Sequence, residues 1–200
     1  MWQLPVAFAD EAAVAAAWRD AQPFPHVIVE DFVPADRLAA LTDQLEEEPI
    51  DPYEADLFAF EASAPEPRSP ELAALRDGFA ATLAAPLSRI VGRTVTRADM
   101  RAFAYRAGHY LLPHTDHRDG LGRVVAYAYY LPSPQPPTGG ELELYRCREE
   151  QGELTAIASA RVIEPAANRL VVFDVSAVSL HQVREVLGGL RMSLAGWFYP

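Results

Sequence analysis

The sequence predicts an α+β fold that is mainly β, with N-terminal supporting helices followed by a jelly roll. Apolar residues recur at helical spacing in the first half, whereas from Thr94 onward they alternate with polar residues. The chain has 200 residues, 50% of them hydrophobic and 22% charged, which suits one domain with one core. We therefore expect a single domain over residues 1–200, with residues 1–93 as mostly helical support and lid and residues 94–200 as the jelly-roll core.

The first half is expected to hold three helices and one short strand. An N-cap candidate precedes the first helix, a proline suits the first turn of the second, and a Ser-Pro pair begins the third. The expected elements are a helix from Asp10 to Arg19, a strand over His26–Val29, a helix from Pro34 that stops before Pro49, and a helix that Ser69 caps and Pro86 kinks or ends.

Negative charge is concentrated in residues 30–71, where thirteen acidic side chains face two basic ones. This excess equals the whole formal charge of −11. The part over residues 47–68 is also rich in proline and holds Tyr53, Phe58 and Phe60. Two interpretations stay open: a lid or binding loop at the mouth of a site, which would attract cationic peptides, or a solvated surface that aids solubility.

The second half reads as a series of short antiparallel strands. Alternating apolar runs are separated by turn signals such as Asp119-Gly120, the stretch 132–140 and Pro165-Ala-Ala-Asn168. A jelly roll is the natural way to close such a set of strands. The clearest strands are expected at residues 123–131, 141–145, 169–173 and 191–198, with Trp197 and Phe198 in the core.

Composition excludes several classes of function and location. The single cysteine, Cys147, excludes an internal disulfide framework and any cysteine-rich metal site. Nucleic-acid binding needs a basic stripe, which this acidic chain lacks. No apolar run approaches the ~20 residues of a membrane span, and Asp10 and Glu11 lie where a signal peptide needs positive charge. We expect a cytoplasmic protein with no nucleic-acid and no membrane partner.

The motif His114-Thr-Asp116 is the first candidate for chemistry. In an extended segment, side chains at i and i+2 leave the same face about 6–7 Å apart, so both can reach one metal ion. His181 would complete two imidazoles and one carboxylate, the facial triad of non-haem iron(II) oxygenases. Alone, a His-x-Asp motif is also common on solvated surfaces. A second such pair, His117 and Asp119, competes with the first but runs into a turn.

Further short motifs accompany this pair in a characteristic order. They are Tyr105-x-x-Gly108, His114-x-Asp116, Tyr129-Tyr130-Leu131, the run Gly139 to Tyr145, the run Asn168 to Phe173, His181-Gln-Val183, and Arg191-x-Ser193 with Gly196-Trp197-Phe198. This order resembles the iron(II)- and 2-oxoglutarate-dependent dioxygenases, in their prolyl 4-hydroxylase-like branch. The runs at residues 23–32 and 56–60 are similar to those of the subgroup that hydroxylates a proline of a ribosomal protein. We expect this chain to form a single catalytic domain of that kind.

The resemblance implies a double-stranded β-helix, cupin-like in form, and assigns roles to individual residues. Fe(II) and O2 would serve as cofactor and oxidant, and 2-oxoglutarate as co-substrate. The resemblance assigns Arg191, on the last expected strand, to the distal carboxylate of 2-oxoglutarate. A guanidinium can pair with a carboxylate through two parallel hydrogen bonds. The implied residues are His114, Asp116 and His181 for iron; Arg191, Tyr130 and Ser193 for 2-oxoglutarate, with Tyr129 facing the other way; and Tyr105 and His109 for substrate.

The implied function is hydroxylation of an unactivated C–H bond, with release of succinate and CO2. A prolyl residue in a protein or peptide is the leading substrate, and a free amino acid or a natural-product intermediate is the alternative. A halogenase would replace Asp116 by a small residue, so the sequence disfavours that chemistry. A jelly-roll module that only binds a partner is the hypothesis from another class, and it would not need the triad and Arg191 together.

Overall fold

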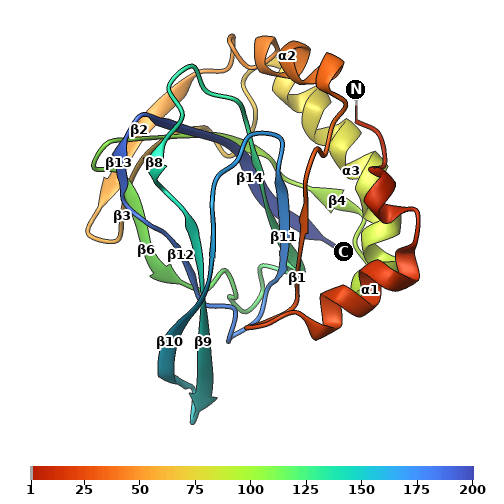
Figure 1. Cartoon of the computed structure of the whole chain (residues 1–200), viewed down its shortest axis with the longest axis vertical. Coiled ribbons are helices and arrows are strands. Elements are labelled where there is room, and N and C mark those ends of the chain that lie inside the picture. Colours follow the sequence, from red (N-terminus) through yellow and green to blue (C-terminus); the bar gives the residue numbers. More distant parts are fainter. Residues whose placement is uncertain (1) are drawn as a thin grey trace.

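The chain forms a curled antiparallel sheet with helices against one outer side (Figure 1). The structure is a computed structural model, and it describes residues 2–200. The helical elements lie almost entirely before the second half, as the sequence predicts. They are the 3-10 helix η1 (Val6–Phe8), α1 (Glu11–Asp20), α2 (Ala35–Asp43) and α3 (Pro70–Val91).

Strands make up most of the remaining chain. In the first half they are β1 (His26–Val29), β2 (Ile50–Ala55) and β3 (Phe58–Ser63). Those of the second half are β4 (Arg97–Ala98), β5 (Arg101–Arg106), β6 (Tyr110–His114), β7 (Val125–Tyr130), β8 (Thr138–Gly139), β9 (Leu142–Glu150), β10 (Glu153–Ile163), β11 (Leu170–Asp174), β12 (His181–Val183), β13 (Val186–Gly188) and β14 (Leu190–Tyr199).

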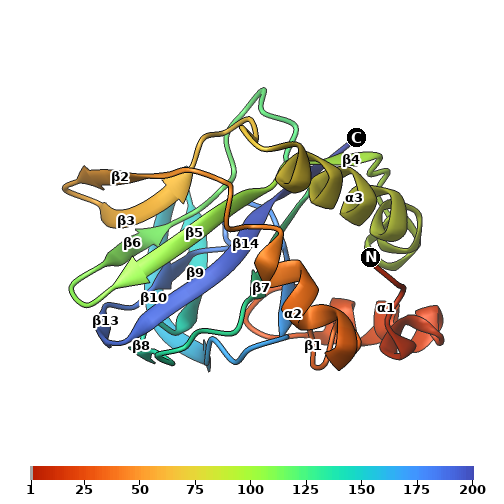
Figure 2. The same cartoon turned by 90° about the horizontal axis from the view of Figure 1, so that it is seen from above.

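The main sheet has twelve strands, and its order differs strongly from the order in the sequence. The path runs β1-β11-β7-β14-β5-β3-β6-β12-β9-β10, with β2 added to β3 and β4 to β14, and β13 pairs with β8 in a second small sheet. Figure 2 shows α1, α2 and α3 together on one side of this sheet, and β2 and β3 at the opposite end. The predicted fold class, a double-stranded β-helix with supporting helices, is thus confirmed.

The two faces of β7 separate the outer core from the interior of the barrel. Tyr127 and Tyr129 point outward and pack with Phe79 of α3 in the larger hydrophobic cluster. Their neighbours Ala126 and Ala128 point inward with Tyr130. This alternation follows from the two-residue period of a strand. It places Tyr129 and Tyr130 on opposite faces, as expected.

The first half contributes more to the sheet than the sequence predicted. Residues 1–93 were expected to be mostly helical, with residues 47–68 as a lid or loop, but β2 and β3 form a hairpin there and β3 lies between β5 and β6. The barrel therefore does not begin at Thr94. The strand signal was weak because β3 is only six residues long and because Pro52 lies in β2, which pairs with β3 alone and so tolerates a missing N–H donor.

The helix caps follow the prediction, whereas one helix end does not. Asp10 accepts a hydrogen bond from the N–H of Ala13, and Ser69 accepts one from Leu72. Pro86 was expected to kink or end α3; it does not end the helix, which continues to Val91 and has Gly92 as its C-cap, with a φ of 69° that suits a glycine. Burial of the apolar face on both sides of Pro86 outweighs the lost backbone bond.

Within the described residues 2–200, no helix has the length and apolar character needed to cross a membrane.

A buried histidine joins the two ends of the main sheet. His26 in β1 accepts a hydrogen bond at Nε2 from Arg161 of β10, over 2.8 Å, and its Nδ1 donates to the carbonyl of Phe24, also over 2.8 Å. Since β1 and β10 are the terminal strands of the sheet order, this contact helps to close the barrel. Only a neutral imidazole can make both bonds, and burial lowers the pKa of His26 below its usual 6.5.

We expect the free energy of unfolding to fall as the pH is lowered below about 6.5, partly through His26. The unfolded chain binds a proton at His26 more readily than the folded one, so acid favours unfolding. Urea denaturation between pH 7.5 and 5 measures the effect. In the His26→Leu variant the free energy of unfolding should fall less steeply with decreasing pH than in the wild type. His181 contributes equally to the pH dependence of both proteins, so the difference reports on His26. Identical pH slopes in the two proteins would contradict this role.

Candidate metal centre

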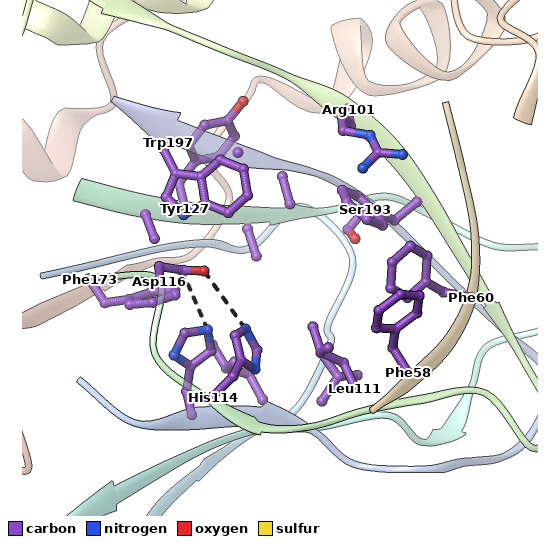
Figure 3. Close-up of a pocket in the computed structure, with 18 of the residues that line it drawn as sticks. Phe58, Phe60, Arg101, Leu111, His114, Asp116, Tyr127, Phe173, Ser193 and Trp197 are labelled. Atoms are coloured by element: carbon purple, nitrogen blue, oxygen red, sulfur yellow. Dashed lines mark ion pairs between the residues drawn. The ribbon is translucent and has the colours of Figure 1, made fainter. Parts of the chain in front are cut away.

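A cavity of about 360 Å³ opens into the barrel, between β14, β7 and β5 on one side and β6 and β12 on the other. Figure 3 shows polar and aromatic side chains converging on this space. Small residues of β7 and β14, among them Ala126, Ala128 and Ala195, form part of its wall. The cavity therefore has room for a bound molecule above a tightly packed sheet.

Three potential metal ligands meet at one side of the cavity. His114 ends β6 and His181 begins β12, and the two residues are directly paired across these antiparallel strands. Asp116 follows two residues after β6, and its oxygens lie 3.8 Å from His114 Nε2 and 3.6 Å from His181 Nε2. One ligand atom from each residue lies within 4.8 Å of the others. The structure thus brings together the three residues that the sequence singled out.

The two imidazoles are held with Nε2 toward the common point. In each ring Nδ1 donates to the backbone carbonyl two residues earlier, Leu112 for His114 and Ser179 for His181, over 2.9 Å. Such outer contacts orient a metal-ligating histidine. Burial lowers the pKa of His181 to about 4, so its ring is neutral and has a free electron pair.

This donor set fits a ferrous ion. Two imidazole nitrogens and one carboxylate are the ligands of the non-haem iron(II) facial triad, in which further coordination positions are available to other ligands. Phe173 packs against His181 with ring centroids 4.7 Å apart and shields it from water. The residues present therefore match the metal expected from the sequence.

The competing pair lies outside this cluster. The side chains of His117 and Asp119 are 46% and 105% exposed, and Asp119 is in the turn before Gly120. They face each other at 3.8 Å with no third ligand among the described residues. The geometry favours His114 and Asp116 as the metal-binding pair.

A buried arginine lies deeper along β14. Arg191 is 3% exposed, and its guanidinium lies between the rings of Tyr105 and Tyr130, at 4.8 and 4.9 Å. Its Nη1 reaches Ser193 Oγ at 3.4 Å, but Arg191 Nε and the Tyr130 hydroxyl are buried without a protein partner. Buried donors without acceptors are costly. Two such donors, one on Arg191 and one on the tyrosine whose ring it contacts, suit the binding of a carboxylate.

The two residues expected at the substrate differ in position. Tyr105 lines the cavity beneath Arg191, and burial raises the pKa of its phenol to about 12, so it is a hydrogen-bond donor at neutral pH. His109 is not among the cavity-lining residues; it lies in the turn between β5 and β6, where its carbonyl accepts from Val186 N–H. The structure places Tyr105 at the site but not His109.

Sequence reasoning missed two further cavity residues beside the triad. Trp197 was expected in the core with Phe198, but only Phe198 is fully buried, and Trp197 lines the cavity with an unpartnered indole N–H. The guanidinium of Arg123 stacks 3.4 Å above Trp197 and donates to the Asp116 carbonyl at 3.3 Å. The alternation Arg191, Ser193, Ala195, Trp197 along one face of β14 was the available signal.

Trp197 is itself held by a partly buried carboxylate, that of Asp99. Asp99 accepts from the Trp197 backbone N–H at 2.5 Å and from the Tyr199 hydroxyl at 2.8 Å. Burial raises the pKa of Asp99, an effect that these hydrogen bonds oppose. The end of β14 is thereby fixed against the loop before β5.

The acidic segment contributes aromatic side chains to the cavity, whereas several of its carboxylates have structural partners. Phe58 and Phe60 of β3 line the cavity opposite the triad (Figure 3). Their neighbours form hydrogen bonds or ion pairs that hold the hairpin to the rest of the chain. These pairs are Glu48 with the Ser69 N–H, Asp51 with Arg68, and Glu61 with Arg106. Part of the acidic segment therefore borders the site, which agrees with the interpretation of residues 47–68 as a segment at the mouth of a site.

Comparison with known proteins places this geometry in a family. The sequence model of the 2OG-Fe(II) oxygenase superfamily matches residues 100–199. Prolyl 3-hydroxylase OGFOD1 of Mus musculus is 32% identical over 204 residues, covering 99% of this chain and 36% of that protein. The chain thus spans about a third of the length of the curated relatives it matches.

Solved structures share the fold. A prolyl-4-hydroxylase from Pseudomonas putida superposes with a TM-score of 0.71 at 24% identity, covering 94% of this chain and 98% of that one. A prolyl hydroxylase from Trichoplax adhaerens, solved with a peptide fragment of the hypoxia inducible factor oxygen degradation domain, gives 0.70 at 16% identity, covering 96% and 90%. At these identities the likeness establishes the fold alone.

Proposed function

The chain belongs to the 2OG-Fe(II) oxygenase superfamily, and from this premise we propose that it hydroxylates a prolyl residue in a protein or peptide. Members of the family use Fe(II), 2-oxoglutarate and O2. The chain is accordingly an oxidoreductase. We further propose that residues 1–200 act as one catalytic domain, because the helices share a hydrophobic core with the barrel.

In this proposal His114, Asp116 and His181 hold the iron. An iron(II) ion held there would supply the redox chemistry by which one oxygen atom of O2 enters the substrate C–H bond and the other enters succinate as 2-oxoglutarate loses CO2. The chain's own contribution is positioning. The Nδ1 contacts keep both imidazoles facing the carboxylate, and Phe173 keeps water from the buried side of His181.

Arg191 and Tyr130 bind the distal carboxylate of 2-oxoglutarate, and Ser193 adds a hydroxyl beside them. The observation that carries the proposal is the buried, unpartnered Nε of Arg191, which lines the same cavity as the triad, together with the unpartnered hydroxyl of Tyr130, whose ring lies 4.9 Å from the Arg191 guanidinium. A guanidinium and a phenol satisfy a carboxylate with charge-assisted hydrogen bonds. A surface that only binds a partner does not require this combination.

The choice of a prolyl substrate rests on Trp197, at the other end of the β14 face that carries Arg191. Trp197, with Arg123 stacked on it, offers a flat apolar face close to Asp116, which suits the ring of a proline. The curated relatives carry the name prolyl 3-hydroxylase, and two neighbours in structure are prolyl hydroxylases. These names support the proposal for this chain.

The test is oxidation of defined substrates by the iron-loaded protein. With 2-oxoglutarate and O2 present, we expect a cell-derived peptide pool to gain one oxygen atom at proline residues, with succinate released in proportion; mass spectrometry and succinate assay measure both. Oxidation of free L-proline alone would favour a small-molecule hydroxylase. Absence of iron binding and of 2-oxoglutarate turnover would instead favour a non-enzymatic binding module.

A further inference from the structure

Arg101 lines the cavity but is not used by the proposed iron and 2-oxoglutarate sites. Arg101 of β5 lies directly opposite Ala195 of β14, whereas Tyr105 of the same strand lies opposite Arg191. Four residues of strand separate Arg101 from Tyr105, which is about 13 Å. A five-carbon co-substrate bound at Arg191 therefore leaves Arg101 free, on the part of the wall between Ser193 and Trp197.

The guanidinium of Arg101 is held in place and has a donor to spare. Its Nε donates to the Ser63 carbonyl at 2.7 Å, and its carbon lies 4.9 Å from the Tyr53 ring and 5.2 Å from the Phe103 ring. Nη2 is buried and has no hydrogen-bond partner. Figure 3 shows the group reaching into the cavity across from the triad. The hydrogen bond to Ser63 satisfies the Nε donor of Arg101 but leaves the Nη2 donor without an acceptor.

The charges around the cavity do not balance. Among the described residues that line it, Asp116 is the only acidic one, whereas Arg101, Arg118, Arg123 and Arg191 are basic. Asp116 faces the two histidines, and Arg191 is matched by the co-substrate. Arg101 then lacks an anion among these lining residues, and its buried Nη2 has no acceptor in the protein, which is unfavourable. A molecule bound in the cavity would supply that acceptor.

We propose that Arg101 binds a carboxylate of the substrate and so selects an acidic group next to the carbon that is oxidised. This inference rests on the proposed function, because it assumes that the substrate lies between Arg101 and the triad. The small side chain of Ala195 leaves the space in front of Arg101 open. An acidic side chain beside the target proline and the α-carboxylate of a free amino acid both present the required group.

Matched acid and amide probes test the proposal. The pairs are Ac-Glu-Pro-Gly-NH2 and Ac-Gly-Pro-Glu-NH2 with their Gln counterparts, and L-proline with L-prolinamide. Calorimetric titration into protein loaded with Mn2+ and 2-oxoglutarate, without O2, measures binding independently of turnover. We expect the acid of at least one pair to bind about tenfold or more tightly than its amide, since a charged hydrogen bond is lost with the amide. The pair that responds identifies the source of the carboxylate.

Arg101→Gln should abolish this preference, because glutamine retains a donor for Ser63 but no charge. Arg106→Gln is the matched control: the same strand carries Arg106, whose partner is Glu61 at the surface, and the preference should persist there. If circular dichroism shows that Arg101→Gln does not fold, Arg101→Lys replaces it. This variant should prefer the acid over the amide, but less strongly than the wild type does.

Equal binding of acid and amide in every pair, or an undiminished preference in the Arg101 variant, would overturn the inference. Oxidation of the peptides is measured in parallel. If the peptides are oxidised but the acids bind no more tightly than the amides, the role proposed for Arg101 is wrong and the proposed function stands. An acid preference without oxidation of any probe and without 2-oxoglutarate turnover counts against the proposed function and leaves the carboxylate site standing.

Discussion

Asp116→Ala is expected to abolish hydroxylation and to weaken Fe(II) binding by more than about 100-fold. Even the loss of groups that merely orient a metal ligand costs about 10- to 100-fold in affinity, and Asp116 is the carboxylate that both histidines face, at 3.8 and 3.6 Å. His114→Ala and His181→Ala should have the same effect, since two remaining ligands do not hold a ferrous ion in place. Anaerobic equilibrium dialysis measures binding, and succinate release measures turnover.

The control for this prediction is His117→Ala. The side chain of His117 is half exposed and lies outside the cluster, so its loss should leave iron binding and hydroxylation unchanged. An inactive His117→Ala together with an active His114→Ala would reverse the assignment between the two His-x-Asp pairs.

Arg191→Lys is expected to weaken 2-oxoglutarate binding by about tenfold or more while leaving Fe(II) binding intact. Lysine preserves the charge but loses the planar fork that meets both oxygens of a carboxylate. It also loses the stacked position between Tyr105 and Tyr130. Titration of 2-oxoglutarate into the Fe(II)-loaded variant without O2 measures the change.

Arg106→Lys is the matched substitution at the surface and should leave 2-oxoglutarate binding unchanged. Unaltered affinity in Arg191→Lys would remove Arg191 from the co-substrate site. A parallel loss of Fe(II) binding would show instead that Arg191 acts through the packing of the barrel.

The two arginines of β5 and β14 divide the cavity into two anion sites under these proposals. Arg191 lies deep in the barrel and Arg101 lies about four residues of strand away from it, with the triad facing the space between. An enzyme of this design would accept two carboxylate-bearing molecules at once, one at Arg191 and one at Arg101.

Local signals were sufficient for much of the molecule. Side chains two apart in an extended segment share a face, so the spacing made His114 and Asp116 candidates for one metal ion, and the motifs around them favoured this pair over His117 and Asp119. Helix caps at Asp10 and Ser69 are formed by neighbours in the chain, and the structure confirms both. The alternation in residues 125–130 likewise determined which face each tyrosine takes. Each of these features depends on contacts within a few residues.

Tertiary structure alone decided the features that depend on distant pairing. His181 meets His114 because β12 pairs with β6, a register that no local pattern in either strand specifies. The insertion of β3 between β5 and β6 brought Phe58 and Phe60 into the cavity and left Arg101 opposite Ala195. An arginine in an alternating strand reads as a surface residue in the sequence. Only the closure of the barrel shows that Arg101 lines the cavity, where its buried Nη2 has no acceptor within the protein.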